Sequence, residues 1–428
     1  FLVYTLYMNV GIIGSGGREH AICLSLKNSS KVNKIYCLPG NAGTYSISNN
    51  INVDINNFQE LKKTIVKFNI DVVIVGPEKP LVDGLVDFLQ QNKIKVFGPN
   101  KVASQLEGSK TFTKNLCKKY NIPTADYKIC FDLIETIEYI KKSKFPLVLK
   151  ADGLAAGKGV YICKNFEDAK SAANEVFNGK FGEAKKILVE EFLNGEEMSF
   201  FVISDGNNFI QFGTAQDHKR VFEGDQGKNT GGMGAYSPSR LESSNLNNKI
   251  LNKIIKPTLK GLSDLNTDFQ GFLYAGLMIV NDEPYLIEYN VRMGDPECQT
   301  ILPKLKTDFG EIIEACINKT LNMIKFDWHD DKSLCIVLCS KGYPDKFINN
   351  IEIENLNNII LQKNEYIFHA GTRNEKDKVF SNGGRVLNIV IRSNNFKNGR
   401  EKAIKIINNI NWSNGFYRKD IGYKVIDK

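Results

Sequence analysis

The chain has 428 residues, of which 42% are hydrophobic and 24% are charged, and its formal net charge is +8. This length predicts two to four domains, each with its own core. Lysines and carboxylates are interleaved rather than gathered into a basic stripe, so we expect a solvated surface and no nucleic-acid partner. No apolar run is long enough to span a bilayer, and no membrane partner is expected.

Residues 1–7 are apolar but lack the basic start and the small-residue cleavage site of a signal peptide. Met8 begins a clean strand, so we expect Met8 to be the true start and residues 1–7 to be an upstream extension. The nine cysteines are an odd number, and their spacing does not suit a metal site. We therefore expect structural thiols in a reducing cytoplasm.

Residues 8–100 alternate apolar strands with helical stretches, which predicts βαβ units and a parallel sheet. The strands are predicted at 9–13, 34–38, 71–75 and 94–97. Ligands of such sheets bind at the carboxyl ends of the strands, where the loops here are rich in glycine.

The first of these loops, Gly14 to His20, fails the dinucleotide-binding pattern because Glu19 stands where the third glycine should be. No acidic residue follows the second strand, so NAD is not expected. The backbone amides of Gly16, Gly17 and Arg18 are candidates to hold one phosphate at the start of a helix. A purely structural tight turn would also place glycines here.

From about residue 108 the pattern becomes α+β. A helix is predicted at 109–120 and another near 246–261, around a glycine-rich loop at 224–234. Strands are predicted at 146–150, 159–163, 187–190, 198–203, 209–214, 271–280 and 284–291, and a last unit opens with strand 334–339. We expect an N-terminal domain over 8–108, a central domain over 109–327 and a C-terminal domain over 333–428.

A second glycine loop runs from Lys150 to Gly159 and resembles a P-loop only superficially. Three residues instead of four separate its glycines before Lys158, and the loop joins two strands. We interpret it as a flexible flap that carries Lys158, with Lys150 at the strand end beneath it. Two lysines near a polyphosphate would neutralise the charge that moves during phosphoryl transfer.

The acidic turn from Glu190 to Glu197 interrupts an apolar strand and is typical of a connector whose backbone could contact adenine. A glutamate-rich turn on a solvated edge would look the same. The run Gly227–Gly234 has too many glycines for a static turn and favours a loop that closes over a reacting phosphate. His218 has no partner at metal-ligand spacing, so we expect it to be a surface or hydrogen-bonded residue.

The segment 284–292 places Glu288, Asn290 and Arg292 at alternate positions and therefore on one face of a strand. Carboxylate and amide oxygens are hard ligands that suit Mg²⁺, and a guanidinium binds a carboxylate bidentately. This triplet suits a magnesium-bound polyphosphate beside an acidic small molecule. The solvated face of an edge strand is the alternative.

Taken together, these residues resemble the ATP-grasp superfamily and, within it, the phosphoribosylamine–glycine ligases (glycinamide ribonucleotide synthetases), from Met8 to about Lys424. The motifs that carry the resemblance are Gly16–His20, Pro39–Thr44, Gln105–Lys110, Lys150–Gly159, Gln216–Arg220, Asn229–Pro238, Gly271–Met278, Gly294–Glu297 and His369–Thr372. The resemblance implies an α/β and α+β multidomain fold: an N-terminal Rossmann-like parallel sheet, a central ATP-grasp fold and a small C-terminal α+β domain.

The resemblance also implies a reaction. ATP phosphorylates the carboxylate of glycine, and the amine of 5-phosphoribosylamine attacks the glycyl phosphate, giving glycinamide ribonucleotide, ADP and phosphate in purine biosynthesis. A monomer acting on these small molecules is expected. The nearest rival is an ATP-grasp carboxylase that acts on bicarbonate and an aminoimidazole ribonucleotide. A nucleotide-binding regulatory module without turnover is the alternative from another class.

Residue roles follow from the same resemblance. The metal ligands for Mg²⁺ or Mn²⁺, with two ions expected, are Glu288 and Asn290. The ATP-binding residues are Lys110, Lys150, Lys158, Glu190, Leu193 and Glu197. The substrate-binding residues are Gly16, Gly17, Arg18, Asn41, Gly43, Thr44, Glu78, Asp217, Arg292, Gly294 and Asp295, and the catalytic residues are Arg292, Lys150 and Asp217. Strand 272–280 lacks the additional acidic metal ligand that many ATP-grasp enzymes place there.

Overall fold

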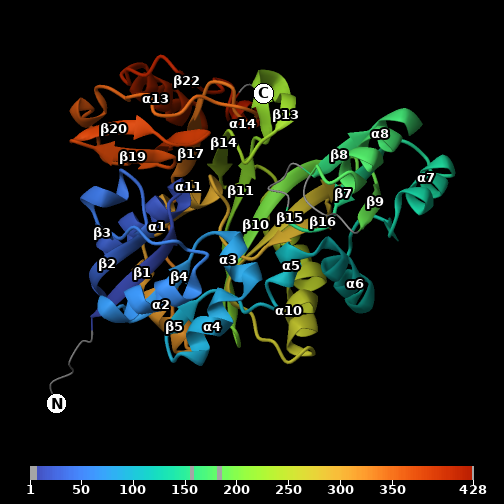
Figure 1. Cartoon of the computed structure of the whole chain (residues 1–428), viewed down its shortest axis with the longest axis horizontal. Helices are drawn as coiled ribbons and strands as arrows, with labels where there is room; N and C mark the ends of the chain where they lie inside the picture. The colour runs from blue at the N-terminus through green and yellow to red at the C-terminus, as the bar shows by residue number, and fades with distance from the viewer. Residues whose placement is uncertain (1–6, 155–158, 181–185, 427–428) are drawn as a thin grey trace.

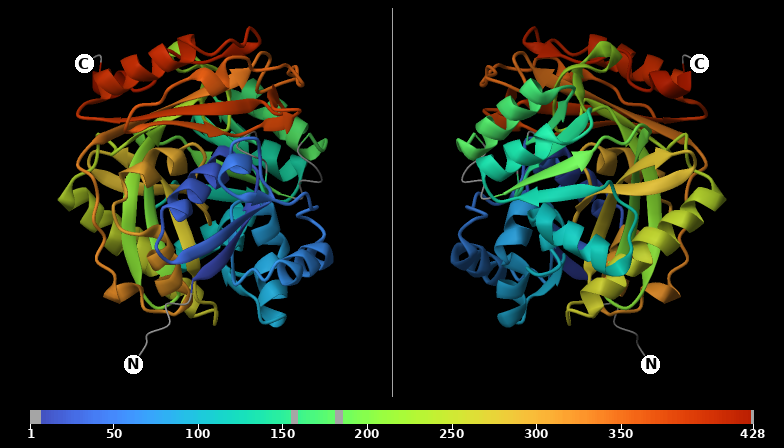
Figure 2. Two further views of the ribbon diagram at one scale, coloured as in Figure 1. Left: turned by 90° about the vertical axis from the view of Figure 1, so that its left-hand side faces the viewer. Right: turned by 90° about the vertical axis from the view of Figure 1, so that its right-hand side faces the viewer.

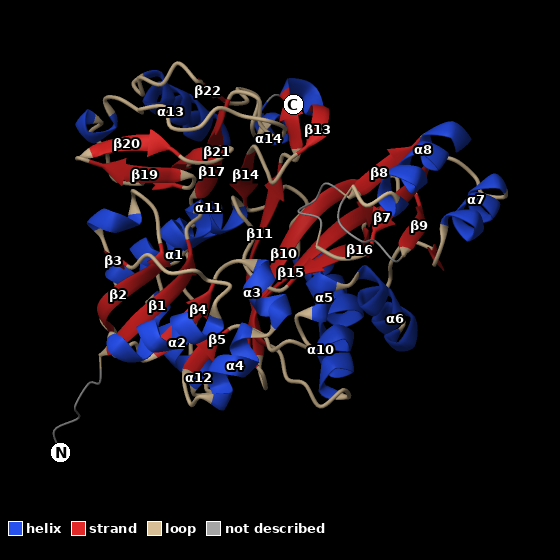
Figure 3. Ribbon diagram, viewed as in Figure 1, coloured by secondary structure: helices blue, strands red, loops and turns tan. Residues whose placement is uncertain are grey.

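The structure, a computed structural model, describes residues 7–154, 159–180 and 186–426. The N-terminal part forms a five-stranded sheet in the order β3-β2-β1-β4-β5, with every neighbouring pair parallel. This confirms the predicted Rossmann-like sheet (Figure 3). Its elements are β1 (Met8–Gly14), α1 (Gly17–Lys27), β2 (Val32–Pro39), β3 (Asn49–Asn50), α2 (Phe58–Lys67), β4 (Val72–Val75), α3 (Glu78–Asp83), α4 (Leu85–Gln91) and β5 (Lys95–Phe97).

A second, antiparallel sheet has four strands in the order β6-β9-β7-β8. It follows two helices that lead out of the N-terminal sheet, and two further helices pack against it (Figure 1). Its apolar interior forms a cluster of its own, separate from the rest of the molecule. The elements are α5 (Gln105–Gly108), α6 (Lys110–Tyr120), β6 (Tyr127–Cys130), α7 (Leu133–Lys141), β7 (Leu147–Ala151), β8 (Val160–Cys163), α8 (Phe166–Phe177) and β9 (Ile187–Glu191).

The third sheet has nine strands, eight of them in the order β16-β15-β10-β11-β14-β17-β21-β18, with β22 beside β17. Because β14 pairs with β17, the sheet runs without interruption from the central part of the chain into the C-terminal part. The strands are β10 (Glu196–Asp205), β11 (Phe209–Asp217), β14 (Gly234–Ser237), β15 (Gln270–Val280), β16 (Glu283–Asn290), β17 (Lys332–Ser340), β18 (Glu365–His369), β21 (Arg385–Ser393) and β22 (Gly415–Phe416).

The remaining elements are helices and two small hairpins. The helices are α9 (Ser244–Ile250), the π-helical η3 (Leu251–Ile255), α10 (Lys256–Ser263), α11 (Glu297–Ile301), α12 (Phe309–Ile317), α13 (Phe396–Asn408) and α14 (Tyr423–Ile426). The hairpins are β12 (Arg220–Phe222) with β13 (Gln226–Asn229) and β19 (Thr372–Glu375) with β20 (Lys378–Ser381). Short 3₁₀ turns are η1 (Thr44–Ser46), η2 (Glu223–Asp225), η4 (Leu302–Lys304), η5 (Leu321–Met323) and η6 (Leu356–Asn358).

The helices begin where the sequence supplies capping side chains. An Asn, Asp or Ser oxygen accepts a hydrogen bond from a first-turn backbone N–H, which satisfies a group that the helix itself leaves unpaired. The residues that cap α2, α6, α7, α8, α9, α12 and α13 in this way are Asn57, Ser109, Asp132, Asn165, Ser243, Asp308 and Asn395.

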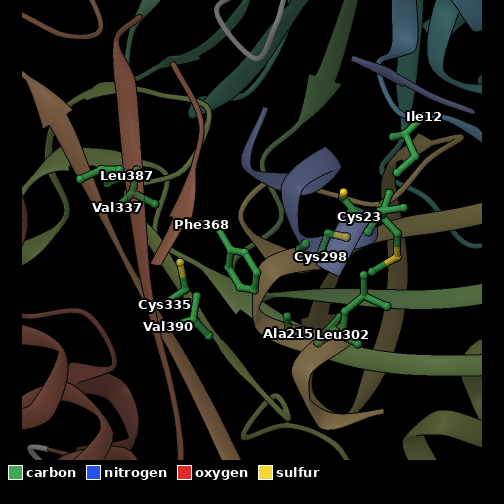
Figure 4. Close-up of a cluster of buried hydrophobic side chains, with 14 of the residues drawn as sticks. Ile12, Cys23, Ala215, Cys298, Leu302, Cys335, Val337, Phe368, Leu387 and Val390 are labelled. Atoms are coloured by element: carbon green, nitrogen blue, oxygen red, sulfur yellow. The ribbon is translucent and has the colours of Figure 1, made fainter. Parts of the chain in front are cut away.

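One hydrophobic cluster joins all three parts of the chain. Helix α1 packs on α11 and β18, so side chains far apart in the sequence share the same interior (Figure 4). Figure 2 shows the C-terminal elements lying across one end of the molecule, above the N-terminal and central sheets. Members of the cluster include Ile12, Cys23, Ala215, Cys298, Leu302, Cys335, Phe368 and Leu387. This shared core fixes the three parts relative to one another.

All nine cysteines lie within the described residues, and each is buried and free of a disulfide. Their burial agrees with the predicted role as structural thiols. Within the described part of the chain, none of the helices combines the length and the apolar character needed to cross a membrane.

The prediction of an open glycine-rich loop at 224–234 is wrong in part. Residues Gln226–Asn229 form strand β13, which pairs with β12. Gly224 lies in the turn with a φ angle of 67°, and Gly227 lies within β13 with a φ angle of 82°. Glycine tolerates this left-handed conformation, so these glycines permit a tight hairpin where the sequence pattern indicated an open loop.

Candidate active site

A cleft of about 1020 Å³ lies where the three parts of the chain meet. The ends of β1 and β4 open into it, as expected for ligand sites of parallel sheets. Most of the predicted site residues line it, namely Gly16, Arg18, Glu78, Lys110, Lys150, Glu190, Leu193, Glu197, Asp217, Glu288, Asn290, Arg292, Gly294 and Asp295. Gly17, Asn41, Gly43 and Thr44 do not line it, and Lys158 lies outside the described residues.

Strand β16 turns its polar side chains into the cleft through a β-bulge. Glu288 pairs with Gly276, but Leu286 pairs with Leu277, so Ile287 is an extra residue in the strand. One inserted residue moves every later side chain to the opposite face. The core side chains are therefore Leu286 before the bulge and Tyr289 after it, while Glu288 faces the cleft.

The two predicted metal ligands present a suitable pair of oxygens. The Glu288 carboxylate makes no hydrogen bond or ion pair with another described residue, and the Asn290 Oδ1 atom accepts one bond, of 3.2 Å, from Arg292. Among the residues that the structure describes, no group of three or more His, Cys, Asp or Glu side chains could hold a metal. A hard cation here would therefore depend on further oxygens from a ligand or water.

Arg292 lies just beyond the end of β16 and is held by two carboxylates. Its Nη2 atom is 2.8 Å from Glu107 Oε1, and its Nε atom is 3.5 Å from Glu78 Oε2. Burial would lower the pKa of Arg292, but these carboxylates outweigh it and raise this pKa above its ordinary value. Arg292 in turn lowers the pKa of Glu78. The guanidinium is thus fixed in orientation while it lines the cleft.

A buried cationic cluster forms one wall of the cleft. Glu190 Oε2 lies 2.7 Å from Lys150 Nζ, and Glu190 Oε1 lies 3.1 Å from Lys114 Nζ. Lys110 Nζ donates to the Gly153 carbonyl at 2.9 Å. Three lysines against one buried glutamate leave a net positive charge, which suits a polyphosphate. Lys114 was not predicted, although it follows Lys110 by one helical turn on the same face.

A second group of charges surrounds Asp217. Lys219 Nζ lies 2.6 Å from Glu197 Oε2, and both residues line the cleft. Burial, with the carboxylates of Glu297 and Glu197, raises the pKa of Asp217 to about 7, although Lys219 opposes this shift. Sequence reasoning assigned no role to Lys219 or Glu297.

Glu297 is buried, and Tyr274 donates a hydrogen bond of 3.1 Å to its Oε1 atom. Ser199 donates to the Tyr274 hydroxyl at 2.9 Å, which fixes the ring. Glu297 is the last residue of the motif Gly294–Glu297. Its place in that motif was the sequence signal from which a role could have been predicted.

The first glycine loop encloses a carboxylate. Glu19 is 2% exposed, its Oε2 atom accepts a 2.6 Å hydrogen bond from the Gly16 amide, and its Oε1 atom lies 2.6 Å from Arg18 Nε. A Cβ atom added at Gly76 would come within 2.0 Å of Glu19 Oε1, and one at Gly14 within 2.7 Å of the same side chain. The glycines thus make room for Glu19, and the Gly16 amide that was predicted to bind phosphate already has an acceptor.

This enclosure predicts that Gly76→Ala destabilises the protein. The new methyl group would overlap the Glu19 carboxylate, and such overpacking costs about 1–3 kcal/mol. Chemical denaturation measures the free energy of unfolding. Gly399→Ala is the matched control, because its nearest neighbour, Ser393 Oγ, is 3.2 Å away. In a Glu19→Ala background the cost of Gly76→Ala should largely vanish, and equal costs in both backgrounds would contradict the overlap.

The loop at 39–44 stabilises itself and bridges to the C-terminal part. Asn41 Oδ1 accepts hydrogen bonds from the amides of Gly43 at 2.9 Å and Thr44 at 3.0 Å. Asn41 Nδ2 donates to the His369 carbonyl at 2.8 Å, and the His369 amide donates to His20 Nδ1 at 2.9 Å. These side chains therefore shape the loop beside the cleft and do not line the cleft themselves.

Three family models match the chain in sequence. They describe the N domain, the ATP-grasp (A) domain and the C domain of phosphoribosylglycinamide synthetase, and they match residues 8–107, 108–298 and 333–424. A phosphoribosylamine–glycine ligase from Brucella melitensis is 41% identical over 422 residues, covering 98% of this chain and 99% of the relative. The ligase of the same name from Caldanaerobacter subterraneus is 42% identical over 416 residues, covering 97% and 99%.

Solved structures are also similar to this chain. The crystal structure of phosphoribosylamine–glycine ligase from Thermotoga maritima superposes with a TM-score of 0.84 at 32% identity, covering 96% of this chain and all of that one. A biotin carboxylase from Campylobacter jejuni has a TM-score of 0.75 at 15% identity, covering 99% and 96%, and shows a likeness of fold.

Proposed function

The chain belongs to the phosphoribosylglycinamide synthetase family, and we infer from this membership that it is an ATP-dependent ligase that joins glycine to 5-phosphoribosylamine. The products are glycinamide ribonucleotide, ADP and phosphate, in purine biosynthesis. The observation that carries this inference is that the lysine cluster, Glu288, Asn290 and Arg292 meet in one cleft.

The reaction proceeds in two steps. A glycine carboxylate oxygen attacks the γ-phosphorus of ATP, the bond to the β-phosphate oxygen breaks, and glycyl phosphate forms. The amine of phosphoribosylamine then attacks the acyl carbon, the C–N bond forms, phosphate leaves and one amine proton is released. Lys110 and Lys150 hold the phosphates, Arg292 orients the glycine carboxylate, and Asp217 accepts the proton.

Glu288 and Asn290 are the proposed metal ligands because their oxygens suit Mg²⁺ or Mn²⁺ and both line the cleft beside the lysines. We propose that two ions bind with ATP. A divalent cation held by Glu288 and Asn290 would supply positive charge that stabilises the phosphates during transfer. The Glu288 carboxylate and the Asn290 amide line the cleft at the proposed metal position.

The nucleotide is proposed to lie along the connector between β9 and β10. Its adenine would contact the backbone from Glu190 to Leu193, and its ribose would contact Glu197, whose carboxylate lines the cleft. Lys158 stays a proposed phosphate ligand. We propose that the enzyme acts as a monomer.

The phosphoribosylamine is proposed to bind at the opposite end of the cleft, near Arg18, Glu78 and Asp295. Asp295 lies 3.4 Å from Arg385 Nη1, and Arg385 also donates to the Gly231 carbonyl at 2.7 Å. The remaining proposed substrate residues are Gly16, Gly17, Asn41, Gly43, Thr44 and Gly294. We propose the domain division 8–108, 109–327 and 333–428 for this enzyme, and its buried free thiols suit a cytoplasmic setting.

The role of Asp217 predicts a pH dependence. A carboxyl group with a pKa of about 7 is protonated below that value and cannot accept the amine proton. The kcat/KM for phosphoribosylamine should therefore fall about tenfold per pH unit below pH 7. Asp217→Asn should lower kcat/KM by about 10²–10⁴-fold and remove this limb of the profile. A wild-type profile that is flat between about pH 5.5 and 7 would contradict the assignment.

The proposed function is tested by measuring ADP formation with purified protein and Mg·ATP. ADP should appear only when glycine and phosphoribosylamine are both present, together with one glycinamide ribonucleotide per ADP. Replacing the two substrates by bicarbonate and an aminoimidazole ribonucleotide tests the carboxylase alternative. ATP consumption that is indifferent to glycine and phosphoribosylamine would overturn the ligase assignment.

A further inference from the structure

The C-terminal segment, defined here as residues 418–426, lies against the hairpin β12–β13. Figure 1 shows α14 beside β13 at the end of the chain. Arg418, which is 1% exposed, connects the two: its Nη1 atom donates to Asp225 Oδ1 at 2.9 Å and to the Arg220 carbonyl at 3.0 Å. Its Nε and Nη2 atoms donate to the two oxygens of Asp420 at 2.8 and 2.7 Å.

Further hydrogen bonds fix the segment to the turn of the hairpin and to His218 just before it. The Gly224 amide donates to Asp420 Oδ2 at 2.9 Å, and the Tyr423 hydroxyl donates to Asp225 Oδ2 at 2.8 Å. The Lys419 amide donates to Glu223 Oε1 at 3.0 Å, and the Gly422 amide donates to His218 Nε2 at 3.2 Å. Buried charges persist when they are paired and hydrogen-bonded, and Arg418 is satisfied by two carboxylates and a carbonyl.

The segment also reaches the cleft. Tyr423 and Lys424 line it, as do Glu196 and Glu197 of the acidic turn. Glu197 is paired with Lys219, and Glu196 with Arg240. Lys424 Nζ lies 5.8 Å from the centroid of the Tyr423 ring and makes no ion pair with any residue that the structure describes.

Lys424 also acts electrostatically on carboxylates that line the cleft. Arg240 lowers the pKa of Glu196 and Lys219 lowers that of Glu197, and Lys424 adds a smaller effect in the same direction on both. Lys424 also lines the same cleft as these two carboxylates, one of which is at the proposed ribose position. An ammonium whose neighbouring carboxylates already have partners is available to an anionic ligand.

Building on the proposed function, we propose that Lys424 is a nucleotide-binding residue that donates to the ribose and first phosphate of ATP, and that Arg418 is the positioning residue that holds it there. Helix α14 thereby completes a nucleotide site whose proposed ATP-binding side chains, from Lys110 to Glu197, lie more than 200 positions earlier. Arg418 touches no ligand, and it acts only by fixing the segment that carries Lys424 to the hairpin.

Direct calorimetric titration of the full chain with Mg·ATP, without glycine or phosphoribosylamine, tests the proposal. Lys424→Met should raise the Kd for ATP by about 5- to 20-fold, as expected for the loss of one partly exposed charge-assisted contact. Lys424→Arg should keep most of the wild-type affinity for ATP. Lys419→Met is the matched control: Lys419 lies in the same segment, its side chain is exposed, and it does not line the cleft. An unchanged Kd in Lys424→Met would overturn the proposal for Lys424.

A double-mutant cycle tests the role of Arg418. Arg418→Met should raise the Kd at least as much as Lys424→Met, and the double variant should bind like Arg418→Met alone, because Lys424 has already lost its position. Additive effects would overturn the positioning role. Far-ultraviolet circular dichroism shows whether each variant is folded, and Asp420→Asn provides a milder disturbance of the same contact.

The outcomes separate this proposal from the proposed function. Wild-type protein that binds Mg·ATP and responds to Lys424→Met as expected, but makes no ADP with glycine and phosphoribosylamine, overturns the ligase assignment alone. Substrate-dependent ADP formation with an unchanged ATP affinity in Lys424→Met overturns the Lys424 proposal alone. Wild-type protein that binds no ATP overturns both.

Discussion

Replacing Glu288 by glutamine should lower kcat with Mg·ATP by on the order of 100-fold or more, since it removes a negative ligand from the site where phosphate charge is stabilised. The glutamine has nearly the same volume, and the carboxylate has no described partner to lose, so the free energy of unfolding should stay near the wild-type value. Steady-state ADP formation over a magnesium titration, together with chemical denaturation, measures both quantities.

Glu283→Gln is the matched control for this experiment. It lies on the same strand, is changed in the same way, and pairs with Lys249 and Lys253 outside the cleft. Its effect on kcat should be less than about twofold, as for other surface pairs. A normal rate for Glu288→Gln at saturating magnesium would remove Glu288 from the site.

Replacing Arg292 by lysine should lower kcat/KM for glycine by about 10- to 150-fold, the value of a lost charge-assisted hydrogen bond. Lysine keeps the charge but cannot bind a carboxylate bidentately. It also cannot reach Glu107, Glu78 and the ligand together, as the guanidinium can. The KM values for ATP should change much less than the KM for glycine.

The matched control is Arg373→Lys on the hairpin β19–β20, where the arginine pairs with Glu375 away from the cleft. It should leave all kinetic constants near wild type. A raised KM for phosphoribosylamine with an unchanged KM for glycine would assign Arg292 to the other substrate.

The regular parts of the fold were predictable because their patterns are local. Strand β4 of the N-terminal sheet, Val72–Val75, is a fully buried apolar run, and such a run predicts a parallel strand without reference to the rest of the chain. Glu288 and Asn290 could be predicted to line the cleft for the same reason, since two polar residues at alternate positions stand out in a buried strand.

Other features depend on contacts that no local pattern reveals. The bulge at Ile287 decides which face Glu288 takes, and the sequence around it shows only alternation. The glycines around Glu19 resembled a phosphate cradle because a glycine that avoids a carboxylate and one that approaches a phosphate look alike in sequence. Arg418 meets Asp225 across 193 positions, a pairing that only the folded chain creates.

The separate core of the four-stranded sheet has a mechanical consequence. Its apolar side chains, such as Leu149 and Val189, do not merge with the interior shared by the other parts. Two hydrogen bonds lie near one of the two connectors to the rest of the chain. The Leu286 amide donates to the Pro123 carbonyl at 2.8 Å, and the Leu286 carbonyl accepts from Thr124 Oγ1 at 2.7 Å. A body with its own core on two thin connectors can turn as a unit. Its backbone amides should exchange with deuterium as one cooperative block. Bound nucleotide, which we propose to contact both this body and the rest of the chain, should slow that exchange.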